Sequence, residues 1–277
     1  MNAEELIKSA VSTFPDPDTA KLDAEILVCH SLKKPRSWLR AFARDELTRE
    51  QVADIQQVFK RRIQGEPVAY ILGEWEFFSL PLKVTPATLI PRPETESLVE
   101  KAIALLVDRP VVNIIDLGTG TGAIALALAS NLPQASVSAT DFSKEALSVA
   151  QLNAQSLGLP VTFYQGSWFQ AVPSNATFDL IISNPPYVAN DDPHMTQGDL
   201  PFEPVTALTA GDDEFADLDE IIRDAANFLN RQGWLMVEHG YYQGARVVEL
   251  FKAAGFTKVQ TEKDLSGNDR FTLGQFN

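Results

Sequence analysis

Residues 111–123 read VVNIIDLGTGTGA, an apolar run followed by three glycines at every second position. The apolar run predicts a strand buried inside a sheet, and the glycines predict a tight turn into a helix. Glycines at such a turn also let a ligand approach the backbone closely. The spacing satisfies the loose dinucleotide pattern G-x-G-x-x-A, so NAD is one candidate ligand for this turn.

Strands and helices alternate from this stretch to the C-terminus. The expected strands cover residues 111–117, 135–141, 161–165, 178–183, 233–239, 256–262 and 270–276, and the expected helices cover 95–107, 122–131, 143–157, 214–230 and 242–254. The alternation predicts an α/β fold, in which a parallel sheet carries helices on both faces. The last two strands have no helix between them, so we expect an antiparallel hairpin there. Residues 189–213 are expected to form a long irregular insertion, typical of a lid or binding loop.

The N-terminal part of the chain has a different pattern. Residues 1–72 show helical periodicity, with a capping box at 48–51, and predict a small bundle of about four helices. The alternating, aromatic-rich stretch 74–84 predicts a β-hairpin with its turn at 79–81. The expected domains are therefore a helical domain over 1–72, a hairpin and linker over 73–94, and an α/β domain over 95–277.

Charge and composition limit the classes of function. Residues 1–72 carry 11 Lys or Arg and 11 Asp or Glu, so the whole net charge of −14 arises in residues 73–277. Such a field repels phosphate backbones and disfavours DNA or RNA as the direct substrate. The single cysteine, the acidic N-terminus and the lack of any long apolar run predict a cytoplasmic protein without disulfides or membrane spans.

Three residues near the ends of the predicted strands are candidates for ligand contact. Asp141 lies about 20 residues beyond the glycines, where a carboxylate reaches ribose hydroxyls in NAD and S-adenosylmethionine enzymes alike; alternatively, it caps the helix that starts near Ser143. Trp168 ends the third strand and either packs against an adenine or belongs to the core. Asp116 is expected to organise the glycine turn or to meet the amino acid part of a cofactor.

Residues 183–188 read SNPPYV and follow the fourth strand, which neighbours the first strand in a doubly wound sheet. Asn184 offers a side-chain oxygen and Pro185 a carbonyl, and two fixed acceptors suit the two hydrogens of a planar NH2 group. Tyr187 offers a flat face for a planar partner. The stretch thus predicts a conjugated amine or amide as the acceptor, made reactive mainly by positioning. A sulfonium methyl group would be its electrophile. The alternative is a rigid turn capped by Asn184.

Glu238 and His239 form the one acid–base pair of note, at the end of the fifth strand. We expect this pair to be structural or part of the pocket wall rather than a catalytic base.

The whole chain resembles the protein-(glutamine-N5) methyltransferases that modify peptide chain release factors. The resemblance is carried by the helical N-terminal part and by four motifs: LIPRPETE (89–96), DLGTGTG (116–122), NPPY (184–187) and DRF (269–271). The glycine and NPPY motifs are shared with adenine-N6 methyltransferases, whereas the proline-rich segment around Arg92 is more specific. The fold implied is a Rossmann-like class I methyltransferase sheet, parallel with a C-terminal antiparallel hairpin, plus the small N-terminal helical bundle.

The resemblance also implies a substrate, a cofactor and site residues. The substrate is the glutamine of the Gly-Gly-Gln loop of release factors, docked by the N-terminal domain, and the protein is expected to act as a monomer without a metal. S-adenosylmethionine is expected to be bound by Gly118, Thr119, Gly120, Thr121, Gly122, Asp141, Trp168 and Asn184. The catalytic and substrate-binding residues are expected to be Asn184, Pro185, Pro186 and Tyr187. Ser167 stands where the family often has an acid, and Arg92 is expected to shape the pocket.

Two other classes of function share this pocket. One is an adenine-N6 nucleic-acid methyltransferase or a ribosomal-protein glutamine methyltransferase. The other is a cofactor-binding protein without catalysis, which the complete NPPY motif disfavours.

Overall fold

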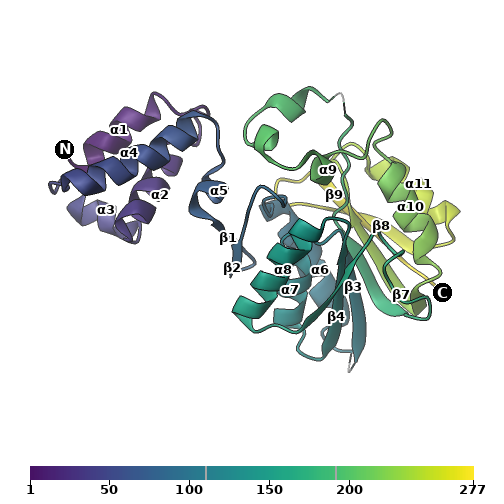
Figure 1. Cartoon of the computed structure of the whole chain (residues 1–277). Coiled ribbons are helices and arrows are strands. Elements are labelled where there is room, and N and C mark those ends of the chain that lie inside the picture. The colour runs from purple at the N-terminus through teal and green to yellow at the C-terminus, as the bar shows by residue number, and fades with distance from the viewer. Residues whose placement is uncertain (110, 191) are drawn as a thin grey trace. The chain divides into compact units, whose positions relative to one another are not determined.

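The computed structural model describes residues 1–109, 111–190 and 192–277 (Figure 1). The chain divides into two compact units. One consists of Met1–Glu74 with Pro193–Phe202, and the other of Trp75–Asp192 with Glu203–Asn277. We call them the helical unit and the sheet unit and describe each by itself.

The helical unit is built from short amphipathic helices around a small apolar core. Its helices are α1 (Ala3–Val11), α2 (Ala20–Leu32), α3 (Ser37–Phe42), α4 (Arg49–Ile63) and α5 (Val68–Leu72). The predicted capping box at α4 is present, because the Thr48 side chain accepts from the Gln51 N–H and the Gln51 side chain accepts from the Thr48 N–H. Leu27, Val28 and Ile55 are fully buried, so the unit has its own core.

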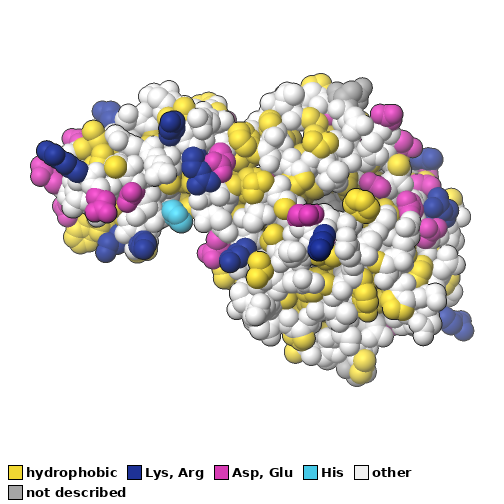
Figure 2. Space-filling model, in the orientation of Figure 1, with side chains coloured by type: hydrophobic (Ala, Val, Ile, Leu, Met, Phe, Trp, Pro, Cys, Tyr) yellow, Lys and Arg dark blue, Asp and Glu magenta, His cyan; other side chains and the backbone are white. Residues whose placement is uncertain are grey.

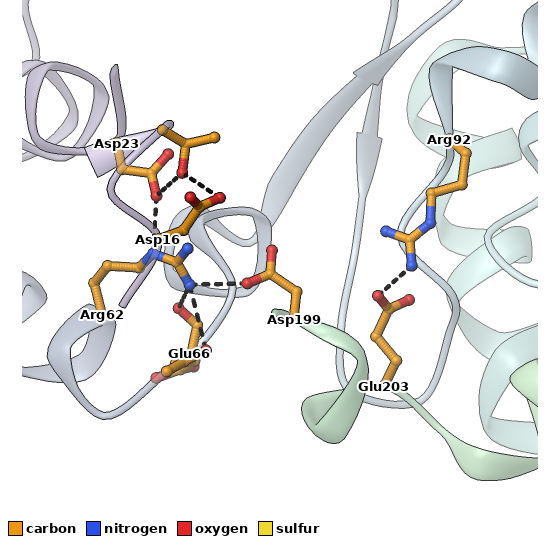
Figure 3. A network of polar contacts seen from close by, with 9 residues as sticks. Asp16, Asp23, Arg62, Glu66, Arg92, Asp199 and Glu203 are labelled. Carbon is orange, nitrogen blue, oxygen red and sulfur yellow. Dashed lines mark hydrogen bonds and ion pairs between the residues drawn. The ribbon is translucent and has the colours of Figure 1, made fainter. Parts of the chain in front are cut away.

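Arg62 of α4 holds the inserted segment 193–202 to the helical unit. Its side chain is only 5% exposed and donates from Nε to Asp23 over 2.9 Å and from Nη1 to Asp199 over 2.8 Å (Figure 3). The same Nη1 also reaches the carbonyls of Gly65 and Glu66. Burial raises the pKa of Asp23, and the guanidinium opposes that rise. One buried cation thereby joins α2, α4 and a segment 137 residues away in the chain.

A two-stranded hairpin of β1 (Glu74–Phe77) and β2 (Leu80–Lys83) follows the helices. Its turn residues are Phe78 and Ser79, with φ values of 51° and 61°. Two consecutive positive φ values are typical of a two-residue type I′ turn, whose twist suits a hairpin. The expected turn at 79–81 is therefore wrong, because Leu80 and Pro81 already belong to β2.

The sheet unit is centred on seven strands in the order β5-β4-β3-β6-β7-β9-β8. The strands are β3 (Val112–Leu117), β4 (Ala135–Asp141), β5 (Val161–Gln165), β6 (Phe178–Ser183), β7 (Leu229–Glu238), β8 (Thr257–Lys263) and β9 (Asp269–Gln275). Adjacent strands from β5 to β7 are parallel, whereas β9 pairs antiparallel with both β7 and β8. The predicted parallel sheet with a C-terminal hairpin is confirmed.

Helices cover both faces of this sheet (Figure 1). On one face, α6 (Glu96–Leu106), α7 (Ala123–Asn131) and α8 (Lys144–Leu157) pack on a core that contains Ile114; on the other, α10 (Ala216–Ala225) and α11 (Gly244–Ala253) pack on a core that contains Ile115. Successive residues of β3 thus point to opposite apolar layers, which explains why its sequence is continuously apolar.

Two expectations about the segments around β6 and β7 are wrong in detail. The helix expected over 214–230 ends at Ala225, and the strand expected over 233–239 begins at Leu229, which pairs with Phe178. Gly233 makes the irregular strand start possible, because a Cβ there would lie 2.8 Å from the Asn230 carbonyl oxygen.

The insertion expected to be irregular over 189–213 also contains regular structure. It includes η2 (Pro193–Thr196), η3 (Leu200–Phe202) and α9 (Val205–Leu208), and Val188 bridges to Thr209. Within the part of the chain that the structure describes, no helix is long and apolar enough to cross a membrane.

Candidate active site

The glycine turn between β3 and α7 depends on backbone conformations that favour glycine. Gly118, Gly120 and Gly122 have φ values of 71°, 56° and 85°. Gly122 is also needed for packing, because a Cβ there would lie 3.0 Å from Leu126 and 3.3 Å from Ala150. Around Gly120 a Cβ would meet nothing within 4 Å, so the backbone there is open to a ligand.

Asp116 organises this turn from inside the protein. Its Oδ2 accepts from the Thr119 hydroxyl over 2.6 Å and from the Ala125 N–H over 3.2 Å. The side chain is fully buried, and burial raises its pKa to about 7 although both hydrogen bonds favour the charged form. Of the two expected roles, these contacts match the organising one.

Asp141, at the end of β4, fixes the middle of the same turn. Its Oδ2 accepts from the Gly120 N–H over 2.8 Å, and its Oδ1 accepts from the Ser143 N–H over 2.9 Å. The cap of α8 itself is the Ser143 side chain, which accepts from the Ala146 N–H. Burial raises the Asp141 pKa, and the two backbone bonds oppose the rise. The carboxylate is therefore held rigidly beside the glycines.

A cavity of about 250 Å³ opens beside these groups. It is lined by Ala87, Thr88, Leu89, Gly118, Gly120, Asp141, Phe142, Ser143, Ala146, Gly166, Ser167, Trp168, Asn184, Pro186, Pro204, Thr206, Ala207 and Asp217. Six expected site residues are among them: Gly118, Gly120, Asp141, Trp168, Asn184 and Pro186. The expected residues Thr119, Thr121, Gly122, Pro185 and Tyr187 are not in this lining.

Three of the expected residues outside the lining, Thr119, Thr121 and Gly122, stabilise the glycine turn that lines the cavity. The Thr119 side chain bonds to Asp116, and the Thr121 carbonyl accepts from the Asn153 amide over 2.9 Å. Gly122 starts α7 and packs tightly against it. These residues shape the turn rather than the cavity surface.

Phe142 and Asp217 are among the lining residues that sequence reasoning did not single out. Phe142 follows Asp141 and is 76% exposed, although it is a large apolar side chain. Its place directly after the acid was the one available signal. Asp217 lies on α10, 76 residues after Asp141. Nothing in its local sequence distinguishes it from other surface acids.

Trp168 belongs to both the cavity lining and the edge of the core. It lines the cavity, and its ring carbon Cζ3 lies 3.0 Å from where a Cβ of residue 118 would be. It also packs against the apolar core on the α10 face. A hydrogen bond from its indole to Asp217 favours the charged form of that carboxylate, whose pKa burial raises. The ring is thus a fixed wall of the cavity.

Asn184 is brought to the cavity by the pairing of β6 with β3. Ser183, the last residue of β6, pairs with Leu117, and its hydroxyl donates to the Leu117 carbonyl over 2.7 Å. The next residue therefore lies beside the glycine turn, as expected for the switch point of such a sheet. The Asn184 Nδ2 donates to the Thr95 hydroxyl over 3.3 Å.

Tyr187 is held at both its backbone and its side chain. Its carbonyl accepts from Gln243 Nε2 over 3.1 Å. Its hydroxyl interacts with Glu238 and Arg270, and burial raises its pKa well above the ordinary value. His239, next to Glu238, bonds to the Gly240 carbonyl and the Thr272 hydroxyl at 2.9 Å each, and burial lowers its pKa.

Arg92 forms an ion pair with Glu203, whose side chain is fully buried (Figure 3). The other Glu203 oxygen, Oε2, accepts from the Ile90 N–H over 3.1 Å. The pair joins the proline-rich segment 88–96 to the start of the segment that carries Pro204 and Thr206 into the cavity lining. Arg92 therefore lies behind the cavity wall.

These groups fit S-adenosylmethionine. The turn offers backbone without side chains at Gly118 and Gly120, Asp141 offers a carboxylate suited to ribose hydroxyls, and Phe142 and Trp168 offer aromatic surface suited to an adenine. The fit rests on the open space at Gly120 and on the carboxylate fixed beside it.

Two family models match the chain. Residues 5–73 match the PrmC N-terminal domain, and residues 109–269 match a methyltransferase domain.

Curated relatives match over nearly the full length. A release factor glutamine methyltransferase of Escherichia coli (strain K12) is 45% identical and covers 100% of this chain and 99% of its own. One of Vibrio cholerae is 48% identical and covers 94% of this chain and 91% of its own.

Solved structures share the fold at low sequence identity. The hMettl16 catalytic domain in complex with a MAT2A 3′UTR hairpin has a TM-score of 0.59 at 17% identity, covering 86% of this chain and 84% of its own. A methyltransferase of Pyrococcus furiosus has a TM-score of 0.53 at 20% identity, covering 72% of this chain and 89% of its own. The sheet unit thus has the Rossmann-like class I methyltransferase fold, and the chain, an S-adenosylmethionine-dependent methyltransferase, belongs to the release factor glutamine methyltransferase family.

Proposed function

We propose that this protein transfers a methyl group from S-adenosylmethionine to the side-chain amide nitrogen N5 of the glutamine in the Gly-Gly-Gln loop of peptide chain release factors. The observation that carries the proposal is the position of Asn184, which lines the same cavity as Gly118, Gly120 and Asp141. The names of full-length relatives support release factors as the acceptor class.

The chain's own contribution is the positioning of the acceptor amide. The Asn184 side-chain oxygen and the Pro185 carbonyl would accept the two amide hydrogens, while Pro186 and Tyr187 would hold the flanks of the amide plane. Accepting both hydrogens returns electron density to the nitrogen and turns its lone pair away from the acceptors. The bound cofactor supplies an electrophilic methyl group on a sulfonium sulfur. Gly118, Thr119, Gly120, Thr121, Gly122, Asp141 and Trp168 would bind the cofactor directly or shape its turn.

We also propose that the helical unit docks the release factor. This unit has a cavity of about 800 Å³ of its own, whose lining includes Lys8, Lys21, Arg40 and Arg44. Figure 2 shows charged and hydrophobic side chains interspersed on the visible face of the molecule, with no single-sign surface there. We expect the protein to act as a cytoplasmic monomer, without metal and without direct contact to nucleic acid.

Transfer of labelled methyl groups to competing acceptors tests the proposal. Purified release factor, the same factor with the glutamine of its Gly-Gly-Gln loop changed to Glu, ribosomes and DNA are each incubated with the protein and labelled S-adenosylmethionine. We expect label on the wild-type factor alone. Label on ribosomes or DNA, with none on the factor, would show that the pocket serves a different acceptor.

A further inference from the structure

Glu238 is a buried carboxylate behind the active-site cavity. It ends β7, is 1% exposed and does not line the cavity. Its oxygen Oε2 has no hydrogen-bond partner among the described residues. Burying a charged carboxylate without full pairing costs folding free energy, so a carboxylate in this place points to a role in the site.

The groups around Glu238 connect it to both ends of the NPPY motif. The hydroxyls of Thr95 and Tyr187 and the guanidinium of Arg270 all lie close enough to the carboxylate to favour its charged form. Arg270 is itself fixed by Asp264, to which it donates from Nε over 3.1 Å and from Nη2 over 2.9 Å. Tyr187 and Thr95 therefore both lie beside Glu238, and Asn184 donates to Thr95.

The direction of these hydrogen bonds decides which end of the Asn184 amide faces the cavity. An ionised carboxylate only accepts, so the Thr95 hydroxyl beside it turns its single hydrogen towards Glu238. The Thr95 oxygen can then only accept from Asn184, and it accepts from Nδ2. With Nδ2 engaged in this way, Oδ1 is the atom left to accept from a ligand. If Glu238 were protonated, Thr95 could donate to Oδ1 instead, and the amide would turn its NH2 group towards the acceptor.

We propose that Thr95 and Glu238 are positioning residues, which hold the Asn184 amide with Oδ1 towards the acceptor nitrogen. This inference rests on the proposed function, in which Oδ1 accepts a hydrogen from the substrate amide. Thr95 does not line the cavity and is 4% exposed, so it acts through Asn184. Tyr187 lies beside the same carboxylate, so Glu238 is close to both flanks of the motif.

The network has a pH dependence with a defined sign. Burial raises the Glu238 pKa to about 7, while Thr95, Arg270 and Tyr187 oppose the rise and Glu94 adds to it. Burial lowers the pKa of the neighbouring His239. The Asn184 orientation that suits catalysis is present when Glu238 is ionised. We therefore expect kcat to rise with pH through about 7, and we expect Glu238→Gln to lose that rise.

A set of Thr95 variants tests the positioning role by single-turnover kinetics. Thr95→Val keeps the shape but removes the hydroxyl, and we expect kcat to fall by about 10- to 100-fold with little change in the Kd of S-adenosylmethionine measured by calorimetry. Thr95→Ser restores the hydroxyl and should recover most of the lost rate. Full kcat in Thr95→Val would overturn the proposal.

The double variant separates positioning from a general structural effect. In the Asn184→Ala background the amide to be oriented is gone, so adding Thr95→Val should cause no further loss. The same fractional loss in both backgrounds would contradict the role through Asn184. If Thr95→Val does not fold, the pH profiles of the wild-type protein and Glu238→Gln decide. Asp116 titrates in both proteins, so an equal rise of kcat through pH 7 in the two would overturn the proposal.

These experiments also distinguish a failure of the positioning role from a failure of the proposed function. All rates are measured with whichever acceptor the wild-type protein methylates. Absence of label on the release factor would contradict the proposed substrate, whereas additive losses at Thr95 and Asn184 would contradict the positioning role alone.

Discussion

At the residue scale, the site consists of polar groups whose partners are fixed by burial. Sequence analysis identified the residues that can be recognised from their type and their position after a strand, namely the glycines of the turn, Asp141 and Asn184. It did not identify Thr95 and Glu238 as partners, because their link to Asn184 depends on how three distant segments meet. For the same reason Asp217 could not be predicted beside Trp168.

A pair of buried threonines tests how strongly such partners matter. Thr140 is fully buried, and its hydroxyl has no partner among the described residues, whereas the Thr272 hydroxyl bonds to His239 and Thr261. We expect Thr140→Val to leave the free energy of unfolding unchanged or to raise it by up to about 1 kcal/mol, because an unsatisfied polar group is removed. The control Thr272→Val should lower it by roughly 1–3 kcal/mol. Urea denaturation measures both, and a larger loss for Thr140→Val would refute this reasoning.

The buried Glu238 should also be visible in the pH dependence of stability. Burial raises its pKa from 4.5 to about 7, so between these values the folded protein holds a proton that the unfolded chain releases. Its contribution to stability is therefore lost as pH rises from about 4.5 to 7, by up to ~3 kcal/mol. Glu238→Gln lacks this titration, whereas Asp116 titrates in both proteins and cancels from the comparison.

Denaturation of both proteins in urea from pH 4.5 to 8 measures this effect. The free energy of unfolding of the wild-type protein minus that of the variant should fall with rising pH and level off above pH 7. A difference that is flat or rises over this range would show that Glu238 is ionised in the folded protein throughout.

At the element scale, the strands around the glycine turn were predicted well because their apolar runs and turn signals agree. The boundary between α10 and β7 was not predicted correctly. It is set by the irregular pairing of β7 with β6 and by the tight backbone at Gly233, rather than by local propensity. The partial order of 189–213 could not be predicted either, since it depends on the contacts of Asp199 and Glu203 with distant arginines.

Two adjacent arginines of α4 provide a matched test of what holds the segment 193–202. Arg62 is buried and pairs with Asp23 and Asp199, whereas Arg61 is 40% exposed and pairs with Glu66. We expect Arg62→Met to lower the free energy of unfolding by about 3 kcal/mol, because it leaves the buried carboxylate of Asp23 without its cation. Arg61→Met should cost less than about 1 kcal/mol.

Amide hydrogen exchange adds a local readout to this comparison. Protection in residues 193–202 should fall in Arg62→Met and stay unchanged in Arg61→Met. Equal protection in both variants would show that Arg62 does not hold this segment.

At the scale of the whole molecule, the net charge of −14 favours the binding of a small cationic cofactor in the cavity. Cofactor binding should stabilise the folded chain by about 2.7 kcal/mol when S-adenosylmethionine is present at 100 times its Kd. NAD should give no shift in Tm at the same concentration. Gly120→Val should abolish the S-adenosylmethionine shift, because a branched side chain would enter the open space beside the turn and is strained at a φ of 56°. A normal shift in this variant would contradict the location of the cofactor.

The proposed function is the transfer of a methyl group to a glutamine amide nitrogen of a release factor. Peptide mass spectrometry of the factor, after incubation with the protein and S-adenosylmethionine, tests it most directly because it locates the modified atom group. We predict one added methyl group on the side-chain amide of the Gly-Gly-Gln glutamine and none elsewhere. An unmodified glutamine in that peptide, with the methyl group on another residue or no methylation at all, would contradict the account.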